Sequence, residues 1–392
     1  MDTTHLPKQF TPSRNLMRNL LTLIIVGVLC SLVGIFFAPE RTWANILLAG
    51  YYLVGIGCGA AMFIALLYVS NAGWATVFRR VPEAMLTSLV AGGIVMLVVM
   101  MGIHSLYEWS RTDIVANDHV LQAKAAWLNV PFFIIRTILY LILWLAYAVH
   151  VSRLSCLQDE HGDVKYTSRS KTASAIFLVV FGLTFTLASM DWIMSLEPHW
   201  YSTIFGIYNL CGSFLSGLAA VTLVVLLLKR MGLFAHVISD QHLHNLGKLI
   251  FAFSTFWMYI WFSQYLLIWY ANIPEEVTFL LHRQQGSWLI FTIINVVFNW
   301  LIPFVALLPA WTKKNEGLLL RVCILIMIGH WIDLFWMILP PFMPDAPVLN
   351  IWELAPMLSV IAGFFYLTFR TLSRRKLIPL GDPMLVESIS QH

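Results

Sequence analysis

Ten long apolar runs occupy most of this sequence, and they restrict its fold more than any other feature. An α-helix needs roughly 20 apolar residues to cross the hydrocarbon core of a bilayer. Charged residues make up only 11% of the chain, against about 25% in a soluble protein. We therefore expect an all-α integral membrane protein with ten transmembrane helices, at residues 16–37, 45–69, 85–107, 131–151, 172–194, 204–228, 248–273, 287–308, 318–339 and 352–369.

The Lys and Arg residues are distributed unequally between the two sides of these spans. Of the 24 in the chain, 19 lie in or beside the loops and termini of one side, and four lie on the other. Those four are Arg41, Arg111, Lys124 and Arg283, while Arg136 lies within a span. Because basic residues collect on the cytoplasmic side, we expect a multi-pass protein with both termini in the cytoplasm.

One spacing recurs in the two halves of the chain. Asp191 precedes Pro198 by seven residues and Asp333 precedes Pro340 by seven, each at the end of a span and four spans apart. Parallel internal repeats produce such a pattern. We therefore expect two four-helix bundles, spans 2–5 (residues 45–194) and spans 6–9 (residues 204–339). Span 1 with the N-terminus (1–44) and span 10 with the C-terminal tail (352–392) would flank them.

Ionisable side chains are rare within the spans, and by the expected topology they share the outer half. They are His104, Arg136, Asp191, His330 and Asp333, with Glu197 just beyond the end of the fifth span. A charge inside a bilayer is costly, so such groups face a bundle interior and are functional candidates. We expect Arg136 or a protonated His104 to accompany Asp191, and His330 to accompany Asp333. Two interpretations remain open: ion pairs that fix helix packing, or groups that transfer protons.

The inner half of the spans offers mostly uncharged polar groups, among them Ser254, Thr255, Asn295 and Asn299. Hydroxyls and amides order water but hold no charge, so an inner proton path would be a water wire. We therefore predict that the acids form a proton exit to the outer side. We also expect no span to be broken by Gly or Pro at the midplane, which argues against a stand-alone secondary transporter.

Cofactor ligands are sparse in this chain. The five cysteines are scattered without C-x-x-C spacing, so we expect no metal, iron–sulfur or haem c site. His104 and His330 are the one pair that could ligate a haem. Gln264 and Tyr265, in an aromatic segment, could flank a quinone, as could His104 and Arg136, although lipid-facing packing is a competing explanation.

The outer loops, at residues 107–130, 274–286 and 340–350, combine acidic and aromatic residues with few basic ones. Such a surface suits the docking of a partner protein, although simple solvation of loops would explain it equally well. Within the first loop, residues 118–128 could form a short amphipathic helix on the membrane.

Three segments resemble a known family. They are residues 190–208 (MDWIMSLEPHWYSTIFGIY), 247–276 (GKLIFAFSTFWMYIWFSQYLLIWYANIPEE) and 330–341 (HWIDLFWMILPP). They are similar to the second quinone-binding-type membrane subunit of bacterial alternative complex III, in the polysulfide-reductase membrane-anchor (NrfD-like) family. The resemblance implies two four-helix bundles in the bacterial inner membrane. It also implies a complex that oxidises menaquinol or ubiquinol and passes electrons to a periplasmic acceptor.

The same resemblance implies the partners and cofactors of the chain. Haem c and iron–sulfur clusters are expected in periplasmic partner subunits, beside a sister membrane subunit and lipid, with no nucleic acid. We therefore expect a membrane subunit of a respiratory or photosynthetic quinol:electron-acceptor oxidoreductase, one that supports assembly and proton translocation without its own redox centre. The alternatives are a quinol-oxidising subunit with a site near His104 and Arg136, and a stand-alone secondary transporter.

Overall fold

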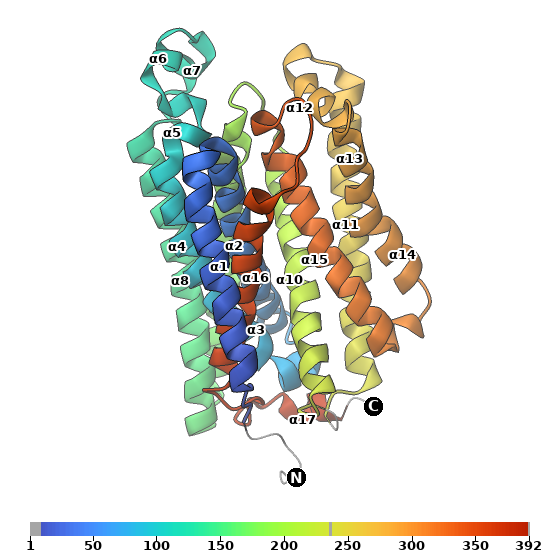
Figure 1. Cartoon of the computed structure of the whole chain (residues 1–392). Coiled ribbons are helices and arrows are strands. Elements are labelled where there is room, and N and C mark those ends of the chain that lie inside the picture. Colours follow the sequence, from blue (N-terminus) through green and yellow to red (C-terminus); the bar gives the residue numbers. More distant parts are fainter. Residues whose placement is uncertain (1–8, 235–236, 391–392) are drawn as a thin grey trace.

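The computed structural model describes residues 9–234 and 237–390, and all regular structure in these ranges is helical (Figure 1). The two chain ends themselves, residues 1–8 and 391–392, lie outside these ranges. Within the described residues, ten helices are long and apolar enough to cross a membrane, which confirms the predicted number. They are α1 (Arg14–Phe37), α2 (Pro39–Val69), α3 to α5 (Arg80–Leu106), α8 (Val130–His161), α9 (Lys165–Trp192), α10 (Phe205–Arg230), α11 (Asp240–Ala271), α13 to α14 (Trp288–Leu307), α15 (Glu316–Ile338) and α16 (Ile351–Leu372).

Two of these spans consist of several pieces, and short helices lie between the others. The third span contains α3 (Arg80–Met85), α4 (Thr87–Val99), η2 (Met100–Gly102) and α5 (Ile103–Leu106). The eighth contains α13 (Trp288–Val296), η5 (Val297–Leu301) and α14 (Ile302–Leu307). The short elements are η1 (Gly73–Phe78), η3 (Glu108–Ser110), α6 (Thr112–Ala116), α7 (His119–Lys124), η4 (Met194–Leu196), α12 (Pro274–Gln284), η6 (Thr312–Lys314), η7 (Pro340–Phe342) and α17 (Leu385–Ile389).

The outer-loop helix α7 is shorter than the predicted 118–128. It begins as expected, because the Asp118 carboxylate accepts hydrogen bonds from the backbone N–H groups of Val120 and Leu121. It ends at Lys124. The next residues form a turn that leads to Asn129, whose side chain accepts a hydrogen bond from the backbone N–H of Phe132. The turn after α7 therefore leads directly to Asn129, the residue that caps the start of α8.

The eighth span contains an irregular turn, although it remains one continuous helix from Trp288 to Leu307. Its middle turn, η5, is a π-helix. Pro303 follows immediately in α14 and has no N–H to donate to the carbonyl of Asn299, four residues earlier. A helical pattern of i→i−4 bonds cannot continue through this point, so the backbone widens.

Helices α2 and α10 form the centre of the molecule. They pack against each other and are the most buried of the spans. Small residues allow this approach: a Cβ added at Gly59 would lie 2.6 Å from the backbone oxygen of Ser213 and 2.9 Å from Cα of Gly217. Close contact through small residues is the usual mode of helix packing in membranes.

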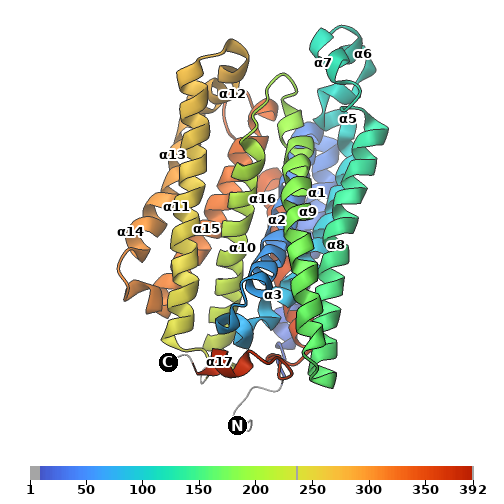
Figure 2. The same cartoon turned by 180° about the vertical axis from the view of Figure 1, so that it is seen from behind.

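The remaining spans surround this central pair. On one side α2 packs against α4, α4 against α8, α8 against α9, and α9 against α2. On the other side α10 packs against α11, α11 against α14, α13 against α15, and α15 against α10 (Figure 2). Helix α1 packs chiefly against α16 and exposes most of its apolar surface.

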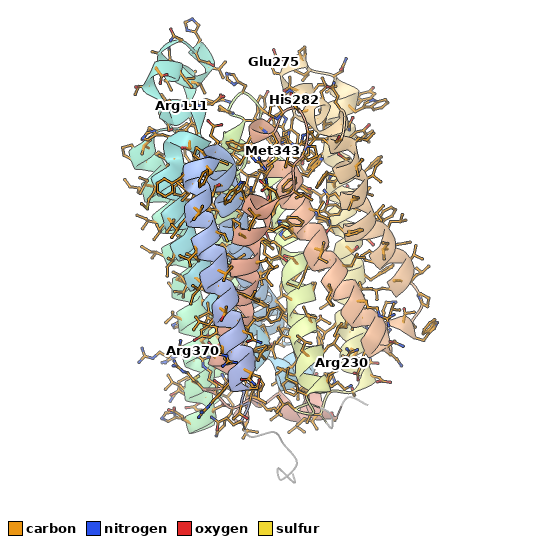
Figure 3. The ribbon with its side chains drawn as sticks, viewed as in Figure 1. Arg111, Arg230, Glu275, His282, Met343 and Arg370 are labelled. Carbon is orange, nitrogen blue, oxygen red and sulfur yellow. The ribbon has the colours of Figure 1, made fainter. Side chains whose placement is uncertain are left out.

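The two ends of the molecule differ in their charged residues (Figure 3). Arg230 and Arg370 lie at the end from which both chain termini emerge, while Arg111, Glu275 and His282 lie at the opposite end. We call the latter the outer end, following the distribution of basic residues.

Buried ion pairs hold the C-terminal tail against the end of the molecule opposite the outer end, which we call the inner end. The Arg79 guanidinium bonds to Asp382 of the tail at 2.6 Å and to Glu83 at 3.3 Å. Arg80 bonds to the same Glu83 at 2.6 Å and to Asp159 of α8. The tail therefore covers the inner end of α3 and α8.

Candidate functional site

Asp191 lies at the end of α9 and is only 1% exposed. Its carboxylate accepts four hydrogen bonds. Arg136 donates through Nε at 2.8 Å and through Nη2 at 2.9 Å. The Tyr140 hydroxyl and the Trp127 indole N–H each donate at 2.9 Å. This paired, two-point contact with a guanidinium is the strongest arrangement available to a buried carboxylate.

Arg136 is held as firmly as its partner. Its Nη1 donates to the backbone oxygen of Trp127 at 2.9 Å. Its guanidinium lies 4.2 Å from the ring centre of Trp127 and 4.3 Å from that of Phe132. Arg136 and Tyr140 are one helical turn apart on α8 and therefore share the face that meets α9. The predicted pairing of Arg136 with Asp191 is confirmed.

Asp333 lies on α15, seven residues before Pro340 as Asp191 lies seven before Pro198. It is also 1% exposed, but its partners are neutral. The Tyr208 hydroxyl and the Asn295 amide both donate to its Oδ1, the amide at 2.7 Å. His330 Nδ1 lies 3.9 Å from the other oxygen, which is too far for a hydrogen bond. Within the described chain, no Lys or Arg forms an ion pair with Asp333.

A chain of polar groups leads from Asp333 toward the middle of the span. The Asn295 side-chain oxygen accepts a hydrogen bond from the Asn299 amide at 2.6 Å. The backbone oxygen of Asn299 in turn accepts one from the Ser254 hydroxyl at 2.5 Å. Ser254 thereby supplies a donor to the carbonyl that Pro303 cannot serve. Asn299 also fits closely against α15, because a Cβ added at Gly329 would lie 2.8 Å from its Oδ1.

Two expectations about the inner half need correction. Asn295 lies at the level of Asp333 and belongs to the outer half, because α13 runs inward from Trp288, only seven residues earlier. Thr255 does not join the chain, because its hydroxyl donates to the Phe251 carbonyl of its own helix at 3.0 Å.

The two halves use matched positions with different chemistry. In each half, the span that precedes the one carrying the aspartate supplies two residues four positions apart. They are Arg136 and Tyr140 on α8, and Asn295 and Asn299 on α13 and η5. The first pair offers a guanidinium and a phenol, whereas the second offers two amides. The negative charge on Asp191 is therefore compensated, and a charge on Asp333 would not be.

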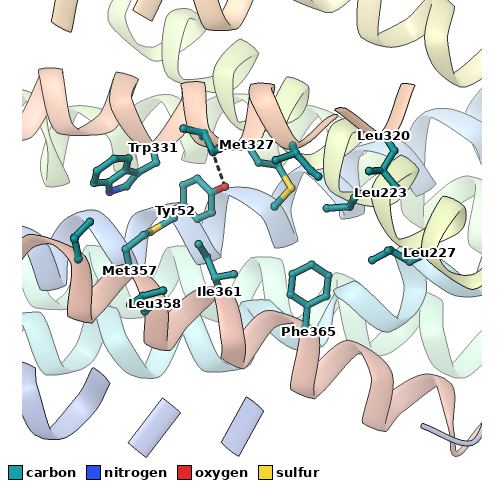
Figure 4. Close-up of a pocket in the computed structure, with 13 residues that line it drawn as sticks. Tyr52, Leu223, Leu227, Leu320, Met327, Trp331, Met357, Leu358, Ile361 and Phe365 are labelled. Carbon is teal, nitrogen blue, oxygen red and sulfur yellow. Dashed lines mark hydrogen bonds between the residues drawn. The ribbon is translucent and has the colours of Figure 1, made fainter. Parts of the chain in front are cut away.

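His330 is buried beside Asp333 in the second half. Its ring lies 5.6 Å from that of Tyr52 on α2, and its Nε2 has no hydrogen-bond partner in the described residues. Tyr52 donates to the Met327 carbonyl at 3.0 Å and lines an apolar cavity of about 470 Å³ between α10, α15 and α16 (Figure 4). The expected His330–Asp333 proximity is therefore present, without a direct hydrogen bond.

Glu197 lies on the outer side of Asp333, near the outer end of the molecule. It accepts a hydrogen bond at 2.6 Å from Arg283, which is fully buried and also donates to the carbonyls of Trp336 and Met337 at the end of α15. Burial lowers the pKa of Arg283, but an arginine remains charged. Glu197 lines an outer cavity of about 340 Å³. Glu108, His199, Trp200 and His282 also line this cavity.

Three other candidates lie apart from this arrangement. His104 is exposed, and its Nδ1 lies 3.1 Å from the Ser110 hydroxyl. The expectation that it faces a bundle interior and accompanies Asp191 is therefore wrong, and it shares no hydrogen-bond partner with Arg136. Gln264 is buried, and its side-chain oxygen has no hydrogen-bond partner among the described residues. Tyr265 stacks on Trp261 with ring centres 5.9 Å apart.

Sequence reasoning missed the neutral partners of the two carboxylates. Tyr140 could have been found from its position four residues after Arg136, on the same helix face. Asn295 and Asn299 show the same spacing, but nothing in the sequence indicated which helix they meet. Trp127 and Tyr208 carry no such signal, because tryptophan and tyrosine near span ends are common in membrane proteins.

Comparisons with known proteins give no identity. No family model matches the chain, and no curated protein matches it significantly. Across residues 9–234 and 237–390, no three or more His, Cys, Asp and Glu side chains are grouped to hold a metal ion. Fold and site together define an all-helical protein suited to a membrane, with two buried carboxylates of unlike surroundings.

Proposed function

We propose that this chain is a non-redox membrane subunit of a quinol:electron-acceptor oxidoreductase, and that Asp333 transfers protons to its outer side. One observation carries the proposal: Asp333 is buried, no Lys or Arg of the described ranges pairs with it, and it lies at the outer end of a chain of polar side chains. Isolated buried charges are costly, whereas a carboxyl that can take up and release a proton avoids this cost. Asp191, paired with Arg136, serves helix packing instead.

The neighbours of Asp333 provide a proton path on its inner side and another on its outer side. Inward of Asn295, which lies at the level of Asp333, Asn299 and Ser254 order water, because amides and hydroxyls can hydrogen-bond water without holding a charge. On the outer side, Glu197 stands at a cavity of about 340 Å³, beyond Arg283. His330, 3.9 Å from Asp333, is a second group able to exchange a proton.

Architecture and location form part of the same proposal. The two closed sequences of helix contacts support two four-helix bundles, spans 2–5 and spans 6–9, with α1 and α16 flanking. Nineteen of the 24 Lys and Arg residues lie on one side of the expected spans, and this supports cytoplasmic termini in a bacterial inner membrane. The resemblance of three segments to alternative complex III and NrfD-like subunits supports alternative complex III as the complex. Haem c and iron–sulfur clusters would belong to periplasmic partners, and quinol oxidation to the sister subunit.

A stand-alone secondary transporter is the second candidate. The π-helical turn beside Pro303 favours it, because such turns in helices are frequent at functional sites. Purification in mild detergent separates the two candidates. Co-elution with haem-containing and iron–sulfur-containing proteins supports the subunit, and elution of a single chain overturns it.

Proton release by the purified complex in lipid vesicles tests the role of Asp333. We expect Asp333→Asn to lower the number of protons released outside per electron while quinol oxidation continues. Asp345→Asn, at an exposed acid on the same side, is the matched control and should release protons like the parent. Unchanged proton release by the Asp333→Asn complex would overturn the assignment.

A further inference from the structure

A groove with apolar walls lies between the inner parts of α2 and α11, and we call it the α2–α11 groove. Its volume is about 310 Å³. Leu66 of α2 lines it, as do Leu249 and Phe253 of α11. The ring of Phe253 packs edge-on against that of Phe214 of α10, with ring centres 4.5 Å apart. Toward the inner end of the molecule the lining becomes a polar rim, formed by Ser70, Asn245 and Lys248.

The polar rim lies at the depth of the lipid head groups. Lys248 and Ala271, the outer end of α11, are about 35 Å apart along the helix. The hydrocarbon core of a bilayer is only about 30 Å thick. Phe253 lies about 27 Å from the same end, within that core. Because side chains lean toward the N-terminus of their helix, which is the inner end of α11, the Lys248 ammonium can extend into the head-group layer.

The polar rim carries positive charge without a paired acid. Lys248 is exposed and, within residues 9–234 and 237–390, forms neither an ion pair nor a hydrogen bond. Lys313 and Lys314 lie nearby, because these two and Lys248 are the charged groups that act on the ring of His244, one helical turn before Lys248. The rim is therefore cationic and offers Lys248 to an anion.

An anionic phospholipid matches both parts of the groove. Its acyl chain fits the apolar walls at hydrocarbon depth, and its phosphate fits Lys248 at the rim. Basic pockets between transmembrane helices on the cytoplasmic side bind anionic head groups in this way. We infer that the α2–α11 groove is a binding site for an anionic phospholipid of the inner leaflet. A zwitterionic lipid fits less well, because its own ammonium would lie among three lysines.

This site also joins the two halves of the molecule. Helix α2 belongs to one set of packed helices and α11 to the other, and the groove lies between their inner parts. A ligand that binds only the folded protein stabilises it. The bound lipid should therefore raise the unfolding temperature as well as fill the groove.

Native mass spectrometry of the full-length chain, purified in mild detergent with any subunits that accompany it, tests the inference. Phosphatidylglycerol and phosphatidylcholine with the same acyl chains are titrated in turn, and the lipid retained on this chain is counted. We expect phosphatidylglycerol to bind more tightly. Lys248→Gln should weaken its binding about fivefold. Lys376→Gln, which removes an exposed charge at the same end, is the matched control and should bind like the parent.

A second pair of variants tests the apolar part of the groove. Leu249→Trp fills the groove and should lower the retention of phosphatidylglycerol, whereas Leu266→Trp, on the exposed face of the same helix, should not. Equal affinity of the parent for the two lipids would overturn the inference, as would unchanged binding in Lys248→Gln or Leu249→Trp. The proposed proton transfer would stand in each case, because Asp333 and its polar partners do not line this groove.

Discussion

At the scale of single residues, Asp191 and Asp333 are equally buried and each precedes a proline by seven residues, while their neighbours differ in charge. A guanidinium meets the first carboxylate at two points, and amide and phenol groups meet the second. Removing one member of a buried ion pair strands the other charge. Replacing a carboxyl that has only neutral partners strands nothing, because an asparagine oxygen can accept the same hydrogen bonds.

Asp191→Asn should therefore destabilise the protein by about 3–5 kcal/mol, because Arg136 would remain buried without a counter-ion. Asp333→Asn should change the stability by no more than about 1 kcal/mol. Unfolding in mild detergent, followed by circular dichroism, measures both variants. Equal losses would mean that the two carboxylates have the same structural role.

The sequence allowed part of this site to be predicted. The depth of the ionisable groups and the Arg136–Asp191 pair followed from the cost of charge in a membrane. His104 was misplaced, because its position near the end of a span leaves its ring at the surface. Tyr208 was missed, because its contact with Asp333 joins residues 125 positions apart, and helix pairing of that range is not encoded in local spacing.

At the scale of elements, the π-helical turn η5 links Pro303, Asn299 and Ser254. Pro303 removes a backbone donor, and the Ser254 hydroxyl supplies another to the same carbonyl at 2.5 Å. In the parent, Ser254→Ala should cost about 1–3 kcal/mol, because a buried carbonyl loses a donor. With Pro303→Ala, the helix can supply its own N–H, so the cost should fall by at least about 0.5 kcal/mol.

A double-mutant cycle of these two substitutions, measured by thermal unfolding, checks the coupling. Thr255→Ala is the matched control, because its hydroxyl bonds within its own helix. Additive effects of Ser254→Ala and Pro303→Ala would refute the linkage.

The stability of the short outer helix α7 should depend on pH. Hydrogen bonds from the backbone N–H of Leu121 and from His199 hold the pKa of Asp118 below its usual 3.8. A group whose pKa is lower in the folded than in the unfolded protein stabilises the fold at pH values above its unfolded-state pKa. This stabilisation is lost as the pH falls through the folded-state pKa. The protection of the amides of residues 119–124 against hydrogen exchange, measured relative to an unstructured peptide at the same pH, should therefore fall as the pH drops below about 3.8. Asp118→Asn keeps a capping side chain and should remove this dependence; an unchanged pH profile in that variant would contradict the role of Asp118.

At the scale of the whole molecule, the number of spans and their approximate positions could be predicted, because hydropathy reports them directly. The central pairing of α2 with α10 and the π-helical turn η5 could not, because they depend on contacts between distant segments and on one proline in an otherwise apolar run. The tail also escaped prediction, since Arg79 and Asp382 meet across 303 residues.

The scattered cysteines and the separated histidines lead to an expectation for the purified chain. Freed from partner subunits, it should show no haem absorbance and contain no iron. A reduced-minus-oxidised spectrum and iron analysis measure this. A b-type band from the chain alone would contradict it and restore His104 and His330 as candidate ligands.

The central claim is that Asp333 changes its protonation state during turnover and Asp191 does not. Infrared difference spectroscopy of the purified complex, recorded while quinol is oxidised, observes the carboxyl groups directly. We predict a band from a protonated carboxyl that is absent in Asp333→Asn and unchanged in Asp345→Asn. A band that persists in Asp333→Asn would contradict the account.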